Sequence, residues 1–120
     1  MRECIRRHSI GFVLAISLVA TSLAQGSHME RSKENSSWLA LTGSIEKMHA
    51  AMSSVKSSGN SDEDFAKLML PHHQAAIDMA KAELINGKDP QMRRLAQEII
   101  TDQQSEIDLM QLWLKQHPTH

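Results

Sequence analysis

Hydrophobic residues recur at spacings of three and four over three stretches of the chain, as they do on one face of an α-helix. No stretch alternates apolar and polar residues as a half-buried strand does, and tyrosine is absent. The pattern predicts an all-α chain of three main helices. The three lines are Leu41, Ile45, Met48, Met52 and Val55; Phe65, Met69, His72, Ala76 and Met79; and Ile99, Gln103, Glu106, Met110 and Trp113.

Breaks between these lines predict where the helices begin and end. The string SSGN at 57–60 ends the first helix, and Ser61 with Asp64 three residues later is a variant capping box that opens the second. Gly87 is expected to end the second helix in a left-handed conformation. Asp89 followed by Pro90 is a strong start signal for the third, which we expect to end near Gln116 because Pro118 follows.

Pro71 lies inside the second helical stretch. Proline has no amide hydrogen, and its ring clashes with the preceding turn, so the second helix is expected to be kinked or broken at Pro71. The break would free backbone carbonyls near the adjacent His72 and His73.

The first 24 residues have the three parts of a secretory signal. Arginines at positions 2, 6 and 7 precede an apolar run at 11–20 that is too short to span a bilayer comfortably, and small residues lead to a cleavage site after Ala24. We therefore expect a periplasmic or secreted protein without stable membrane insertion after cleavage. The predicted organisation is a signal peptide at 1–24, a polar lead-in at 25–43 with a tag-like GSHM, a helical domain at 44–117 and a tail at 118–120.

Composition narrows the chemistry that is available. The only cysteine, Cys4, lies within the predicted signal, so the exported chain has no disulfide, thiolate ligand or cysteine nucleophile. A formal net charge of −1 gives no basic surface for nucleic acid. The helical domain is small enough that its core is marginal unless its helices pack very well or two chains associate, so a homodimer is one expected assembly.

Methionine and histidine occur together on the predicted helices. Met69 precedes His72 and His73 by three and four residues, so all three side chains can converge across one helical turn. The string KMHAAM places Met48, His49 and Met52 together in the first helix. Thioether sulfur prefers Cu(I), and imidazole binds Cu(I) and Cu(II) alike, so copper is the metal that this set of side chains favours over zinc.

Structural interpretations of the same residues stay open. A methionine on an apolar line commonly fills a gap in a core, and Met92 is interpreted in that way alone. The two histidines could be solvated or cap a carbonyl beside the proline, and His117 and His120 are expected to be solvated. Gln103 and Glu106 could satisfy each other or a buried histidine. The spacing from Glu46 to His49 fits a di-iron site, but no second Glu-x-x-His follows.

The strings DFAKLMLPHHQAAIDMAK and GKDPQMRRLAQEIITDQQSEIDLMQLWL resemble a family catalogued as domain of unknown function 305, which includes periplasmic CopM-type copper metallochaperones. The resemblance covers about residues 44–117 and implies a ferritin-like four-helix type of bundle that binds copper through methionine and histidine. Carried over by position, the implied metal ligands are Met48, His49, Met52, Met69, His72, His73, Met79 and Met110.

We therefore expect an exported copper-binding protein that serves as a metallochaperone or sequesters copper in copper resistance. It would bind Cu(I), with Cu(II) as the second oxidation state to consider, and hand copper to another periplasmic copper protein. The alternatives are a helical interaction module with structural methionines and histidines and, behind it, a ferritin-like di-iron protein. No nucleophile with a positioned base is evident in the sequence, so we do not expect an enzyme.

Overall fold

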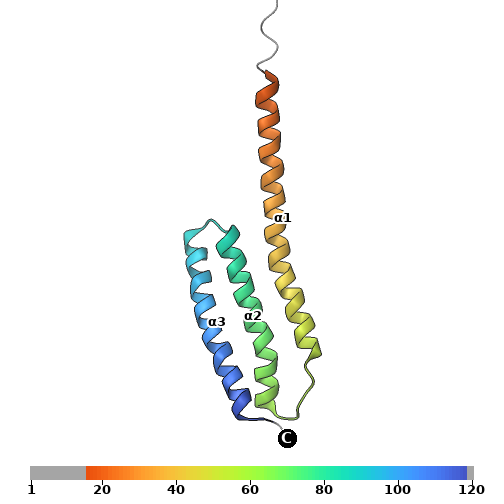
Figure 1. Cartoon of the computed structure of the whole chain (residues 1–120), viewed down its shortest axis with the longest axis vertical. Coiled ribbons are helices and arrows are strands. Elements are labelled where there is room, and N and C mark those ends of the chain that lie inside the picture. The colour runs from red at the N-terminus through yellow and green to blue at the C-terminus, as the bar shows by residue number, and fades with distance from the viewer. Residues whose placement is uncertain (1–15, 119–120) are drawn as a thin grey trace, which may run out of the picture. The chain divides into compact units, whose positions relative to one another are not determined.

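A computed structural model describes the backbone of residues 16–118 and the side chains of residues 28–118. This part of the chain forms three helices, α1 (Ile16–Ser54), α2 (Ser61–Asn86) and α3 (Pro90–Gln116), and contains no strand (Figure 1). The prediction of an all-α chain with three main helices is confirmed. The chain divides into two compact units, Met1–Ser32 and Lys33–His120, and the boundary falls within α1.

Helix α1 is longer than the apolar pattern indicated. It has 39 residues and includes the whole polar lead-in predicted at 25–43. Polar residues such as glutamate, lysine and glutamine are good helix formers when solvated, so the absence of an apolar line does not end a helix. The predicted cleavage site after Ala24 falls within α1 and stays a prediction, and residues 1–15 of the predicted signal lie outside the described residues.

The part of α1 that belongs to the second unit buries a narrow line of side chains. Ser44 is buried, and its hydroxyl donates to the carbonyl oxygen of Ala40 at 2.9 Å, so this polar group is satisfied within the helix. Leu41, Met48 and Met52 on the same line are partly buried. Ile45 is 37% exposed, so the covered line runs through Ser44 rather than through Ile45 as predicted.

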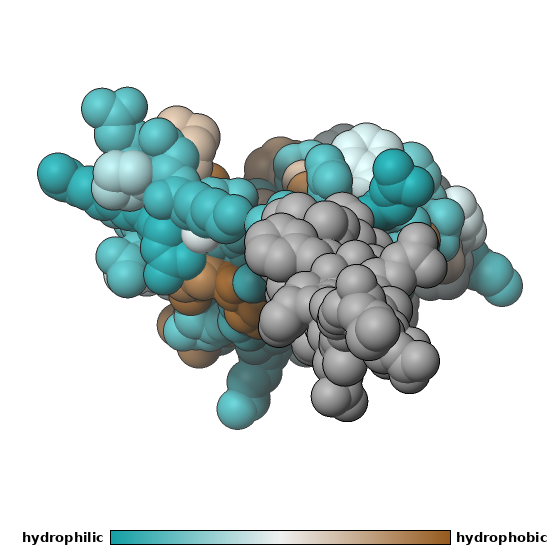
Figure 2. Space-filling view, turned by 90° about the horizontal axis from the view of Figure 1, so that it is seen from above, coloured by the Kyte–Doolittle hydropathy of each residue, from teal (hydrophilic) through white to brown (hydrophobic). Residues whose placement is uncertain are grey.

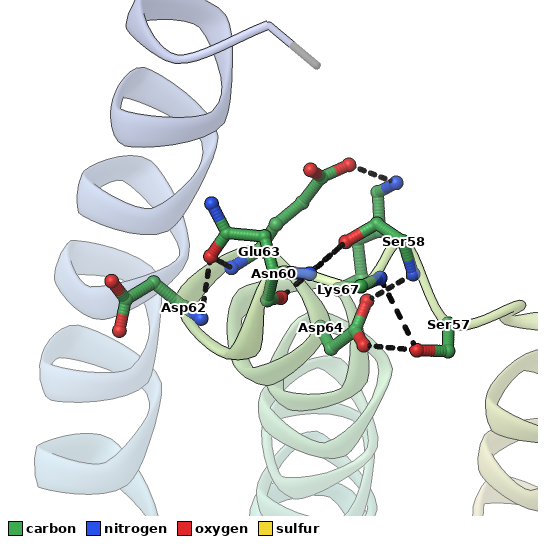
Figure 3. Close-up of polar contacts among 8 residues, drawn as sticks. Ser57, Ser58, Asn60, Asp62, Glu63, Asp64 and Lys67 are labelled. Carbon is green, nitrogen blue, oxygen red and sulfur yellow. Dashed lines mark hydrogen bonds and ion pairs between the residues drawn. The ribbon is translucent and has the colours of Figure 1, made fainter.

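The N-cap of α2 lies one residue earlier than the sequence indicated. Asn60, not Ser61, is the N-cap, because its extended backbone lets Oδ1 accept from the amides of Asp62 at 3.0 Å and Glu63 at 3.4 Å (Figure 3). Gly59 precedes it with φ of 82°, a left-handed conformation that glycine adopts at little cost. The expected capping box from Ser61 to Asp64 is therefore wrong in its register.

Asp64 instead closes the loop in front of α2. Its carboxylate accepts from the hydroxyl of Ser57 and from the amide of Ser58, both at 2.7 Å (Figure 3). These hydrogen bonds, that of Ser57 above all, hold the pKa of Asp64 below its usual value because they favour the charged carboxylate. The buried Glu63, next to Asp64 in sequence, forms an ion pair with Lys67, which lies one turn further along α2. The start of α2 is thus fixed by contacts between residues close in sequence.

Helix α2 continues through Pro71 as one helix of 26 residues. Proline removes the amide that would bond to the carbonyl of Lys67, but burial of the turns on both sides, at Ala66 and Ala75, stabilises the helix across this gap. The predicted break into a short helix and a longer one is therefore wrong, and the alternative, a kink at Pro71, stays a prediction.

Three residues connect α2 to α3. Gly87 has φ of −68°, so the predicted left-handed conformation is wrong. Glycine fits here for another reason: a Cβ at Gly87 would lie 2.7 Å from the carbonyl oxygen of Glu83 and would also clash with the Glu83 side chain. The Arg93 guanidinium donates to the carbonyls of Leu84 and Gly87 at 2.5 and 3.1 Å, which ties α3 to the end of α2.

The predicted start of α3 is confirmed. The Asp89 carboxylate accepts from the amides of Gln91 and Met92, both at 2.9 Å, and Pro90 is the first helical residue. The helix ends at Gln116, where the sequence placed its end. Because the connection is short, α2 and α3 run antiparallel and pack along their length (Figure 1).

The seam between α2 and α3 consists mainly of small residues. Ala66, Ile77 and Ala80 of α2 and Ala96 and Ile107 of α3 are buried there. Small side chains let the two helices approach closely, but they bury little apolar area each. Ala75 and Ala82 are buried on another side of α2, which α3 does not cover.

The apolar lines predicted for the second and third helices lie beside this seam rather than in it. Phe65, at the start of the second line, is 61% exposed, and His72 is exposed as well. On α3 the buried positions are Ala96 and Ile107, whereas Ile99 and Trp113 of the predicted line are only partly buried. Alanine is only weakly hydrophobic, so it contributes little to an apolar pattern. The pattern therefore placed the seam about a quarter turn around each helix from its observed position.

Candidate functional site

His73 is a polar residue of the seam. It lies on the same line of α2 as Ala66, Ile77 and Ala80, and its side chain is 15% exposed. Its Nδ1 lies 2.9 Å from the carbonyl oxygen of Met69, one turn earlier on α2. Its Nε2 lies 2.6 Å from Oε2 of Glu106 on α3, which is 33 residues away in sequence. His73 therefore joins the two helices and is held at both ring nitrogens.

The two partners of His73 determine which protons the ring carries. A backbone carbonyl accepts hydrogen bonds and cannot donate, so Nδ1 donates to Met69. The Glu106 carboxylate also accepts, so a ring that satisfies both contacts donates from Nε2 as well and is positively charged. A metal needs an unprotonated nitrogen, so a metal at Nε2 would take the place of this proton and Glu106 would have to move aside. Nδ1 keeps its carbonyl partner, an arrangement that commonly orients a metal-binding histidine.

Two methionines lie one turn from the His73–Glu106 contact. Because α2 and α3 are antiparallel, one turn back from His73 and one turn forward from Glu106 reach the same level of the pair, at Met69 and Met110. Four residues of helix correspond to about 6 Å along the axis. Both methionines are partly buried. The helix pair thus brings one imidazole, one carboxylate and two thioethers to a single short section.

His72 is next to this section but faces solvent. The centroids of the His72 and His73 rings are 6.1 Å apart, and the ring planes are inclined by 61°. Neighbouring residues of a helix point about 100° apart, so the rings diverge and His72 is exposed beside the seam. The paired histidines of the sequence therefore differ: His73 is held between two helices, and His72 is accessible.

The remaining predicted ligands are further along α2 and on α1. Met79 is on α2 about 9 Å along the axis from His73 and on the same flank as His72. Met48 and Met52 are partly buried on α1, and His49 is exposed there. Among the described side chains, no hydrogen bond or ion pair joins His49 to the contact between His73 and Glu106. Met69, His72, His73 and Met110 thus lie at neighbouring levels of the α2–α3 pair, and the predicted grouping of the α1 residues with them stays a prediction.

Histidine, cysteine and carboxylate side chains alone do not make a metal site here. Within residues 28–118, no three or more of them lie close enough together to hold one ion. The spacing from Glu46 to His49 has no matching second pair in this region, so the di-iron alternative gains no support.

The C-terminal end of α3 has a second aromatic contact. The ring of His117 stacks on Trp113 with 4.4 Å between centroids and 14° between planes, and its Nδ1 donates to the Trp113 carbonyl at 2.9 Å. His117 thus caps α3 and is exposed to solvent, as expected. His120 lies outside the described residues.

Glu106 is the residue of this site that was absent from the predicted site residues. It appeared only as a polar interruption in the third apolar line, with a buried histidine as one suggested partner. The contact with His73 confirms that suggestion for Glu106. The available signal was that an acidic residue and a histidine interrupt apolar lines on two helices joined by a short connection.

No helix in the described part of the chain is long and apolar enough to cross a membrane. The fold and the site together define an all-helical protein in which a histidine–glutamate contact joins two antiparallel helices between methionines. The chain belongs to the family described as Domain of unknown function (DUF305), whose model matches residues 15–114.

One curated relative is an uncharacterized protein of Acanthamoeba polyphaga mimivirus. It is 43% identical over 49 residues, which make up 41% of this chain and 32% of the relative. The chain therefore matches about a third of that protein's length.

Proposed function

We propose that this protein binds copper, as Cu(I), through methionine and histidine side chains at the level of His73 in the α2–α3 pair. The observation that carries the proposal is the contact between His73 and Glu106, which places Met69 and Met110 one turn away at the same level of two packed helices. Thioether and imidazole are the ligands that Cu(I) prefers, and residues 28–118 contain no cysteine that could compete for the metal.

The local geometry suits a transfer site better than a permanent one. Glu106 occupies the ring nitrogen that copper would use, so metal binding and the helix–helix contact exclude each other. His72 and Met79 lie on the open flank next to the site and offer further ligands to copper as it arrives or leaves. Met48, His49 and Met52 on α1 would form a separate, weaker site of the same chemistry.

Export and copper handling are proposed together. The signal-like segment at 1–24 would bring the protein to the periplasm or outside the cell, where it would sequester copper or pass it to another copper protein. A ferritin-like bundle with a bend of α2 at Pro71 is the arrangement proposed for the loaded form. The second candidate function is a helical interaction module, which the exposed apolar side chains of α2 and α3 favour.

Competition titrations with a chromogenic Cu(I) chelator and a Zn(II) indicator test the proposal. Because soft ligands dominate the site, Cu(I) should compete far more successfully than Zn(II). Met92→Leu is the matched control, since Met92 is 48% exposed and lies near the start of α3, well away from His73. Equal and weak binding of both metals would contradict copper binding and support the interaction module.

A further inference from the structure

The two flanks of the α2–α3 seam have opposite chemistry. At helical spacings of three, four and seven, the seam continues through the partly buried Leu70, Ile100, Gln103 and Leu114. Residues that come just after seam positions are mainly polar: Lys67, Gln74 and Lys81 on α2, and Gln97, Gln104 and Lys115 on α3. Residues that come just before seam positions are mainly apolar. They include Phe65, Met69, Met79, Leu95, Ile99 and Trp113.

The apolar residues of both helices face the same way. Each step along a helix turns the side chain by about 100° in one sense, and an antiparallel partner reverses both the chain direction and the side that it presents. Residues just before the seam in α2 and in α3 consequently share one side of the pair, here called the apolar flank. The Glu106 carboxylate lies on this side and reaches His73 from it.

The apolar flank is open in the single chain. Phe65 is 61% exposed, Met92 48% and Leu95 46%, which is far more than these side chains show inside a folded domain. In the space-filling view, apolar surface reaches the exterior between polar groups (Figure 2). The seam below the flank is built mainly of alanines, so the pair buries little apolar area without a further layer.

We propose that the apolar flank of α2 and α3 is the contact surface of a homodimer. The α2–α3 pair of one copy packs through its apolar flank against the same flank of the second copy, which gives two layers of two helices. The flank contains no lysine or arginine, and its acidic residues are Glu83, Asp102 and Glu106, the last of which contacts His73. This charge distribution disfavours nucleic acid, acidic proteins and anionic lipid, all of which seek basic groups. A second copy needs no opposite charge there.

The size of the flank also fits a second copy. A helix of 26 residues is about 39 Å long, and two helices of about 10 Å diameter side by side present a face of roughly 800 Å². Stable protein interfaces bury about 800 Å² on each partner. The flank is therefore large enough for a dimer, with Phe65 near one end of the helix pair and Leu95 near the other as its exposed apolar contacts.

Sedimentation equilibrium of the full, metal-free chain in the presence of EDTA tests the dimer. The expected mass is twice 13.4 kDa. Phe65→Glu and Leu95→Glu should each raise the dimer dissociation constant by more than ~10-fold, because a carboxylate would be buried against apolar groups. Far-UV circular dichroism verifies that each variant remains helical. If a glutamate variant loses its helical signal, the alanine variant at the same position, Phe65→Ala or Leu95→Ala, is measured instead.

Ile85→Glu and Leu112→Glu are the matched controls. Both residues are exposed to a similar degree as those of the flank, at 75% and 52%, but Ile85 follows the seam and Leu112 lies on the side of α3 away from the seam and the flank. They should leave the dissociation constant unchanged. A monomeric parent would overturn the proposal, as would a dimer that the controls weaken as much as the flank variants. Because the assay contains no copper, its outcome is independent of the proposed metal binding.

Discussion

The polar contacts at the start of α2 and those at its centre differ in how far along the chain their partners lie. Asn60 and Asp64 hold the helix start through residues at most seven positions away. His73 instead meets Glu106 at a distance of 33 residues, across two helices. The first group follows from local rules of capping and serves stability alone. The second exists only because the helices pack, and it places a potential ligand between methionines.

His73→Gln should produce the largest functional change. Glutamine keeps a polar group opposite Glu106 but cannot supply an imidazole nitrogen, so the affinity for Cu(I) should fall by roughly 10- to 100-fold. Chelator competition at fixed protein concentration measures it. His72→Gln is the matched control, because His72 is exposed and its loss should have the smaller effect. Equal losses for the two variants would show that the helix–helix contact does not select the ligand.

Met69→Leu and Met110→Leu should separate metal binding from packing. Leucine has a similar volume and hydrophobicity, so the free energy of unfolding should fall by less than about 1.5 kcal/mol. Leucine has no sulfur, so copper affinity should still decrease in both variants. Urea denaturation and Cu(I) competition measure the two effects on the same samples. Loss of stability with unchanged affinity would assign these methionines to packing.

Asn60→Ala should produce the opposite outcome from the methionine variants. Removing an N-cap acceptor typically costs about 1 kcal/mol of stability, and copper affinity should stay at the parent value. Asp89→Ala removes the equivalent cap from α3 and should give a similar loss. A drop in copper affinity for either variant would mean that the helix starts and the site are coupled.

Acid should weaken the start of α2 slightly. The pKa of Asp64 is lowered in the folded protein, so its contribution to stability is present above the ordinary value near 3.8 and is lost as the pH falls through the lowered pKa. Asp64→Asn should therefore lower the free energy of unfolding slightly at neutral pH and remove part of its decrease in acid, because the variant has no carboxylate that the two hydrogen bonds can favour. An identical acid dependence in parent and variant would show that the loop contacts of Asp64 do not persist in solution.

Local features were predictable from the sequence where one residue decides the outcome. Asp89 followed by Pro90 fixed the start of α3, because few other conformations use that pair. Asn60 and Ser61 are both good caps, and only the backbone of Gly59 places Asn60 in the N-cap position. The helix-breaking effect of Pro71 was overestimated for a related reason. Burial on both sides keeps α2 continuous, and the sequence alone does not show which residues are buried.

The seam and the site were only partly predictable. Alanines form most of the seam, and they have too little hydrophobicity to stand out against methionine and phenylalanine on the neighbouring flank. The sequence therefore placed Met69, His72 and Met79 on a common line and grouped His73 with them, whereas packing separates His73 from His72. The pairing with Glu106 depends on the level at which two antiparallel helices meet, which the three-residue connection and Arg93 set.

X-ray absorption spectroscopy of the protein loaded with one equivalent of Cu(I) tests the central claim most directly. The account predicts a first coordination shell that contains sulfur together with imidazole nitrogen, because Met69 and Met110 flank His73. In Met69→Leu the sulfur contribution should decrease while the imidazole contribution remains. A shell of nitrogen and oxygen alone would contradict the claim that thioethers of the α2–α3 pair hold the metal.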